Sequence, residues 1–154
     1  MSKRTRSIVK GAIAGLLGGI AGTAAKYAVE KVYPPRVHGE PEPAALIADQ
    51  VSETSIKLNQ GPVAKQTVHW GIGAGTGAIY GAVAEFYPQA TAKQGAEFGI
   101  AMVALSHDST LPIVGLATKP EPRTTREKTS ELVSHIAYGI VTETVRRVVR
   151  GMID

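Results

Sequence analysis

The sequence predicts an all-α membrane protein, a polytopic helix bundle of about four transmembrane helices with a short amphipathic helix between the first two spans. Charged residues make up only 19% of the 154 residues, and 17 residues are glycine, against about 25% and 7% in soluble domains. Weakly polar runs long enough to cross a bilayer alternate with proline-rich or charged stretches. The length fits one domain, residues 1–154; a soluble α-helical domain is the alternative.

The first span is expected over residues 8–33. It follows a basic block, continues as a helical pattern through Val32, and stops at Pro34 and Pro35, because proline cannot continue a helix. A signal peptide cleaved among the small residues 21–25 is the alternative. The helical pattern beyond that point favours a span.

The rest of the chain divides at its prolines and charges. Apolar residues spaced by three to four predict an amphipathic helix over residues 43–58. Three further spans are expected at residues 67–87, 94–116 and 129–149. Four spans place both termini on one side, and the N-terminal basic block with the C-terminal arginines makes that side the cytoplasm.

Glycines recur at intervals of four in the first two spans. Such spacing lines one helix face with small residues, which lets helix backbones approach closely in lipid. The functional alternatives are a glycine-lined pore and a phosphate-cradling loop at residues 71–75. A dinucleotide fingerprint is disfavoured, because Thr76 stands where its third glycine belongs. We expect a helix-packing role for Gly15, Gly19, Gly73, Gly77 and Gly81.

Titratable residues inside the predicted spans sort into two layers, and such residues in a membrane face partners or water. The outer layer contains Lys26, Glu30, His69, His107, Asp108, Glu131 and His135. The inner layer, near the cytoplasmic face, contains Glu85, Glu97, Glu143 and Arg146. Histidines beside carboxylates can bind protons, carry protons or hold a metal ion. The alternative is a buried ion-pair network that fixes helix register.

Several classes of chemistry are disfavoured. The chain has no cysteine, which excludes disulfides, thiolate metal sites and cysteine nucleophiles. It lacks the HExxH spacing of zinc hydrolases and the GxSxG elbow of serine hydrolases. The net charge of +4 comes without a dense basic run carrying stacking aromatics, so nucleic acid is not an expected partner. We therefore expect no enzyme, no cofactor and no metal.

The pattern from His69 to Arg150 resembles the YagU family of bacterial inner-membrane proteins. The stretches HWGIGAGTGAIYGAVAEFYP, SHDSTLPIVGL and EKTSELVSHIAYGIVTETVRRVVR carry the resemblance, with AAKYAVEKVYPPR in the first span. The segment between residues 44 and 58 is less similar. The resemblance implies a multi-pass inner-membrane protein of a largely uncharacterised family, loosely connected with acid tolerance, and it implies no established chemistry.

Two functional hypotheses follow. In the first, the outer polar layer senses or conducts protons or small ions. In the second, the chain is a structural or accessory subunit of a larger membrane complex and transports nothing. Because no charged residue lies in the expected middle of the bundle, around Ala78, Val103 and Ile140, a sensor or a structural unit is favoured over an open channel. A homo-oligomer or a membrane complex is expected, because four short spans enclose little interior.

Overall fold

The computed structural model describes residues 2–35, 62–105 and 124–153. These residues form four α-helices and one 3-10 helix, in the order α1 (Lys3–Val32), α3 (Pro62–Ala84), η1 (Pro88–Gly95), α4 (Ala96–Val103) and α6 (Thr125–Met152), and they contain no strand. The all-α fold predicted from the sequence is confirmed. The predicted amphipathic segment, residues 43–58, lies outside the described residues.

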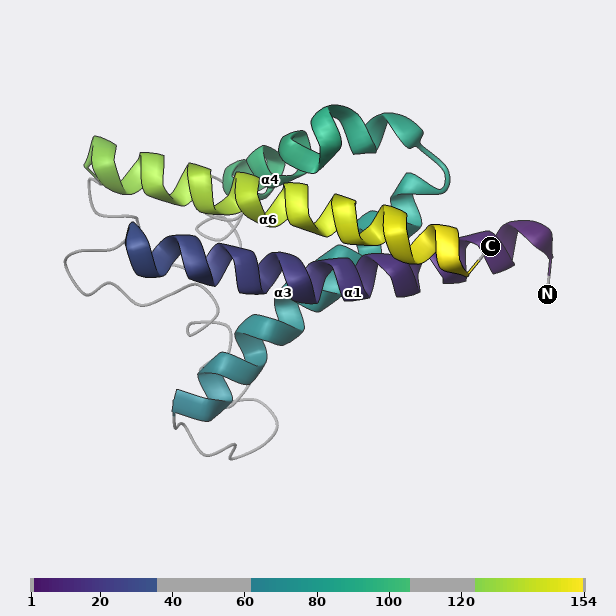
Figure 1. Ribbon diagram of the computed structural model, residues 1–154, viewed down its shortest axis with the longest axis horizontal. Helices are drawn as coiled ribbons and strands as arrows, with labels where there is room; N and C mark the ends of the chain where they lie inside the picture. The colour runs from purple at the N-terminus through teal and green to yellow at the C-terminus, as the bar shows by residue number, and fades with distance from the viewer. Residues whose placement is uncertain (1, 36–61, 106–123, 154) are drawn as a thin grey trace.

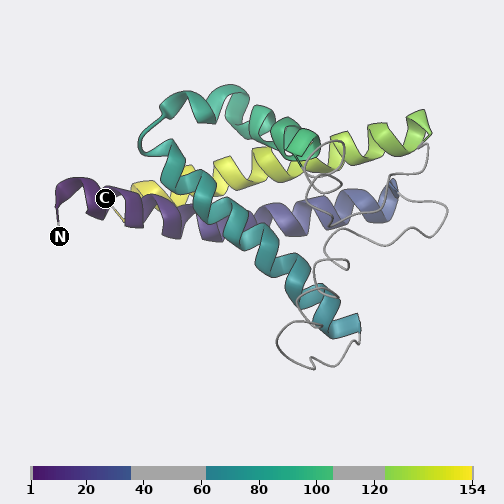
Figure 2. The ribbon, with the colours of Figure 1, turned by 180° about the vertical axis from the view of Figure 1, so that it is seen from behind.

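Helices α1 and α6 run antiparallel side by side, and both termini lie at the same end of the bundle (Figure 1). Helix α3 packs against the middle of α1, from Gly11 to Thr23, and diverges from it toward its own N-terminus, as the view from behind also shows (Figure 2). Helix α4 lies along α6 on the side away from α1. Helix α1 is thus the element against which both long partners pack.

The helix ends follow local sequence signals. Helix α1 is capped by Ser2, whose hydroxyl accepts a hydrogen bond from the backbone N–H of Thr5 at 3.1 Å. Helix α6 begins with a capping box in which Thr124 and Glu127 satisfy each other's backbone N–H groups. This capping box starts the helix at residue 125, four residues before the predicted span.

The chain between α3 and α4 departs from the predicted spans. Helix α3 ends at Ala84, three residues before the predicted limit, because Pro88 disfavours a helical conformation at Tyr87, which is extended (φ −130°, ψ 80°). Gly95 has φ +84°, a left-handed conformation that glycine adopts at little cost. Helix α4 starts only after it, at Ala96.

Backbones meet at glycines on both sides of α1. A methyl group on Gly77 would lie 2.6 Å from Cα of Gly19, and one on Gly81 would lie 2.8 Å from Cα of Gly15. Gly73 faces the side chain of Thr23. The five glycines expected to serve helix packing therefore all lie in the α1–α3 contact.

The opposite face of α1 meets α6 in the same way. A methyl group on Gly18 would lie 3.2 Å from the carbonyl carbon of Thr142, and one on Gly22 would lie 2.7 Å from the carbonyl oxygen of Tyr138. Gly139 makes a third contact of this kind, with Gly99 of α4. At each of the three main helix contacts, a Cβ atom added to one of these glycines would therefore push the two helices apart.

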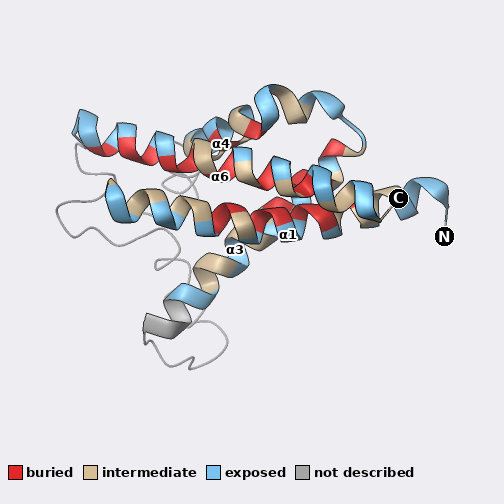
Figure 3. Ribbon diagram, in the orientation of Figure 1, coloured by how far each residue is buried: buried red, intermediate tan, exposed pale blue. Residues whose placement is uncertain are grey.

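The distribution of side chains is the reverse of that in a soluble bundle. The buried hydrophobic residues among the described ones are Ala14, Tyr80, Ala84 and Tyr138, and the others in the interior are glycine or polar (Figure 3). Large apolar residues point outward instead, and the exposed fraction is 69% at Ile79 and 87% at Val32. Among the described helices, α1 is the one whose length and composition suffice for it to cross a membrane.

Two substitutions in α3 distinguish the effect of the helix contact on stability from the effect of helix propensity. Gly77→Ala places a methyl group against the backbone of Gly19 and is expected to lower the free energy of unfolding by about 2 kcal/mol. Gly75→Ala, with no atom within 4 Å of the new methyl group, is expected to leave stability unchanged or raise it by up to about 1 kcal/mol. Thermal unfolding in detergent measures both; equal effects would contradict the close α1–α3 contact.

Candidate functional site

A stripe of polar side chains covers the buried face of α6. Its members are spaced by three or four residues, with pairs of neighbours, which is the pattern of one helix face. The buried polar members are Glu127, Ser130, Glu131, Ser134, His135, Tyr138, Thr142, Glu143 and Arg146. We call this stripe the polar seam. Along the middle of α6 the exposed residues are Leu132, Val133 and Ile140, and the exposed charged residues Arg126, Lys128 and Arg147 lie toward its ends.

Glu143 is the centre of the inner end of the polar seam, and it is fully buried. Its carboxylate accepts two hydrogen bonds from Arg146, at 2.6 and 2.9 Å, and one from Nε of Arg147 at 2.6 Å. The hydroxyl of Tyr80 in α3 donates to the same carboxylate at 2.8 Å. These four hydrogen bonds supply the pairing that a buried charge needs.

Glu85, at the end of α3, forms the second half of this inner cluster. Its carboxylate accepts hydrogen bonds from Arg150, at 2.8 and 3.1 Å, and from the hydroxyl of Ser7 in α1. Nη1 of Arg146 lies 3.9 Å from the same carboxylate, which links the two glutamates. Side chains of α1, α3 and α6 are therefore tied together at the end where the termini lie.

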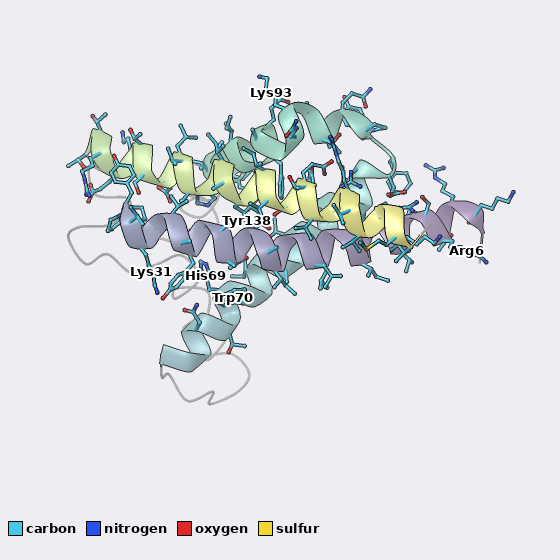
Figure 4. All side chains as sticks on the ribbon, in the orientation of Figure 1. Arg6, Lys31, His69, Trp70, Lys93 and Tyr138 are labelled. Carbon is cyan, nitrogen blue, oxygen red and sulfur yellow. The ribbon has the colours of Figure 1, made fainter. Side chains whose placement is uncertain are left out.

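Glu97 does not join the inner cluster, although the sequence placed it there. It forms an ion pair with Lys93 at 3.1 Å, and the side chains are 48% and 75% exposed. Lys93 points away from the bundle in Figure 4. The left-handed residues Lys93, Gln94 and Gly95 redirect the chain before α4, so that Glu97 faces outward.

Lys26 and Glu30 form the α1 part of the outer layer. They are one helical turn apart and form an ion pair that is largely buried. The hydroxyl of Ser134 in α6 donates to Glu30 at 3.3 Å, which joins the pair to the polar seam. The structure thus brings Lys26 and Glu30 to α6.

Glu131 and His135 are the buried titratable residues of the outer layer on α6. Nδ1 of His135 lies 2.9 Å from the backbone carbonyl oxygen of Glu131. His69 is half-buried and lies on the part of α3 that diverges from α1, next to Trp70 (Figure 4). His107 and Asp108 lie outside the described residues.

Hydroxyl groups occupy the middle of the polar seam, where the sequence suggested an apolar region. The Tyr138 hydroxyl donates to the carbonyl oxygen of Gly73 at 2.7 Å. One turn further, the buried Thr142 hydroxyl has no hydrogen-bond partner among the described residues. Phe98 of α4 stacks on Tyr80 with ring centroids 4.1 Å apart and lies 5.8 Å from the Tyr138 ring. The middle therefore contains hydroxyls and rings, but no charge among the described residues.

Four members of the inner cluster were not singled out from the sequence: Ser7, Tyr80, Arg147 and Arg150. Arg147 follows Glu143 by four residues, so helical spacing alone predicts this pair. Ser7, Tyr80 and Arg150 are held by contacts between helices, which no local pattern specifies. Among the described residues, no three histidine or acidic side chains are grouped closely enough to hold a metal ion.

Comparison with known proteins gives a family without a described activity. The model of the family described as "Protein of unknown function (DUF1440)" matches residues 20–144, which include the outer layer and the three glutamates of the inner layer but not Arg146. No curated protein and no solved structure matches the chain.

The geometry of the inner cluster predicts that substituting Glu143 lowers the free energy of unfolding much more than substituting Glu97. Glu143→Gln leaves Arg146 and Arg147 without their buried counter-charge and is expected to lower the free energy of unfolding by about 3 kcal/mol. Glu97→Gln removes an exposed ion pair and is expected to change it by less than about 0.5 kcal/mol. Denaturant unfolding in detergent micelles gives both values, and similar values for the two variants would contradict this description of the cluster.

Proposed function

We propose that the chain, which belongs to the DUF1440 family of proteins of unknown function, is a multi-pass membrane protein that responds to protons through its polar seam. The observation that carries the proposal is the distribution of side chains on α6. Its buried face is polar and titratable, whereas the residues exposed along its middle, Leu132, Val133 and Ile140, are apolar. Lipid around the bundle accounts for the apolar residues that α6 exposes, and a response to protons inside the bundle accounts for its buried titratable residues.

The dimensions of α1 support a bilayer as the surroundings. Lys26 follows Ser7 by 19 residues, a rise of about 28 Å along an α-helix, close to the hydrocarbon core of about 30 Å. Between them Lys10 is the one charged residue, and it lies near enough to the end to reach the headgroups.

Aromatic residues support the same placement, because tyrosine, tryptophan and other aromatics gather at membrane interfaces. At one end of the bundle Phe86 is 48% exposed and Tyr87 is 59% exposed. At the other end Tyr27 is 43% exposed, and Tyr33 lies beneath the guanidinium group of Arg126 at 5.0 Å.

The likeness to YagU proteins supports the bacterial inner membrane as the location. The two termini lie together, and the basic block at the start of α1 and the arginines at the end of α6 meet there, which supports a cytoplasmic position for that end. The outer layer then faces the periplasm, where bacteria meet external acid.

The state of the charges supports a sensor rather than an open channel. The inner carboxylates Glu85 and Glu143 are both paired with arginines, and the middle of the polar seam has no described charge to carry a proton across. His135, whose side chain is enclosed beside Glu131, is the group we expect to gain or lose a proton near neutral pH. Protonation there changes the charge of the outer layer and thereby the packing of α6 against α1 and α4.

A structural or accessory subunit of a membrane complex is the second candidate. A methyl group added to Gly71 or Gly75 on α3 would meet no atom within 4 Å among the described residues, so this small face is open to another helix. In that case the partner is a second copy or another membrane protein, and no response to protons is expected.

Cysteine accessibility tests the membrane topology, because the chain has no cysteine of its own. In cells with a permeabilised outer membrane, a membrane-impermeant maleimide is expected to label Thr125→Cys but not Ser2→Cys. After the inner membrane is opened, both variants should react. Equal labelling of the two positions in intact cells would exclude the proposed topology.

The fluorescence of Trp70, the single tryptophan, tests the response to protons. Between about pH 8 and pH 5 the liposome-reconstituted protein is expected to show a transition near the histidine range. His69→Gln serves as the background, because a protonated histidine beside Trp70 would quench it directly. Adding His135→Gln to that background should remove the transition, whereas adding Thr144→Ala on the exposed face should not.

Proton flux measured in the same liposomes distinguishes the two forms of the first hypothesis. A sensor shows the fluorescence transition with no flux above that of empty liposomes. Flux that His135→Gln abolishes would instead establish conduction. A background variant with neither a transition nor flux would contradict the proposal and favour the accessory subunit.

A further inference from the structure

We infer that the end of the bundle that carries the two termini binds anionic phospholipid headgroups through Lys3, Arg4 and Arg6. We call these three residues the basic patch. This inference rests on the proposed membrane location and adds a chemical class of partner. Its observations concern the first turns of α1, which take no part in the polar seam.

The basic patch lies beyond the packed part of the bundle. Helix α1 extends past the end of α6, and Arg6 projects from this extension in Figure 4. All three side chains belong to exposed residues. Ser7, which follows directly, contacts Glu85 and Arg150, so the basic patch starts where the contacts between helices stop.

Among the described residues, no acidic side chain forms an ion pair with the basic patch. The first turn of α1 has no acidic residue, and Glu85, which contacts Ser7, already accepts hydrogen bonds from Arg150. The positive side chains also lie at the N-terminal end of a helix, where the macrodipole is positive and repels them. An anionic surface offsets both the unpaired positive charges of the basic patch and their repulsion by the macrodipole.

Exposed aromatics beside the basic patch indicate a lipid surface rather than a dissolved anion. Arg4 lies over the ring of Phe86, 4.9 Å from its centroid. Phe86 and Tyr87 are both exposed at the end of α3. Aromatic rings at headgroup depth with cations next to them match the boundary between acyl chains and phosphates, whereas a free phosphate would gain nothing from the rings.

Native mass spectrometry of the detergent-solubilised full chain tests this inference, with phosphatidylglycerol and phosphatidylcholine as probes. Wild type is expected to retain phosphatidylglycerol preferentially. The triple variant Lys3→Gln, Arg4→Gln, Arg6→Gln is expected to bind it at least about tenfold more weakly, because each cation near an anionic surface contributes to binding. Raising the salt concentration should weaken the wild-type binding as well.

The control removes three positive charges at the opposite end. Lys31→Gln, Arg126→Gln and Lys128→Gln together should leave phosphatidylglycerol binding unchanged. Equal weakening by both triple variants, or no preference of wild type for the anionic lipid, would overturn the inference. Competition by inorganic phosphate at millimolar concentration would also overturn it, because it would point to a soluble anion.

A failure of this inference can be distinguished from a failure of the proposed function. A protein that fractionates with membranes and shows the Trp70 transition, but has no preference for anionic lipid, would refute only the basic patch. A protein recovered in the soluble fraction would refute the proposed membrane location itself.

Discussion

The architecture depends on the close approach of helix backbones at glycines. Gly15, Gly19 and Gly77 bring α1 and α3 together, and Gly18 and Gly22 do the same for α1 and α6. At such short separations there is no room for large apolar side chains between the helices. Dispersion and polar contacts between backbones must then stabilise the bundle in place of a conventional apolar core.

A bundle of this kind can bury polar groups only where partners are supplied across the helix contacts. Glu143 meets this condition through Tyr80 and the arginines of its own helix, and Glu85 through Arg150. The same contacts fix the rotation of α6, because turning the helix would expose Glu143 to the surroundings and leave Tyr80 without its acceptor. Packing and electrostatics therefore specify the same arrangement.

Helical spacing in the sequence was enough to predict the all-α fold, the glycine face of α1 and α3, and the pairing of Glu143 with Arg146, and the expected topology placed Glu85 at the same end of the bundle. Residues three or four apart share a helix face whatever the tertiary structure. The orientation of Glu97 could not be predicted, because it depends on the left-handed turn at Gly95 that sets where α4 begins. The partners of Glu85 lie on other helices, far away in the chain.

The order of synthesis gives the link between Glu85 and Arg150 a consequence for biogenesis. Glu85 leaves the ribosome 65 residues before Arg150, so its carboxylate lacks this partner until the last helix has been synthesised. Only then can the end of α3 be tied to α6. A chain truncated before Arg150 would therefore keep Glu85 without this ion pair, although α1, α3 and α4 are complete.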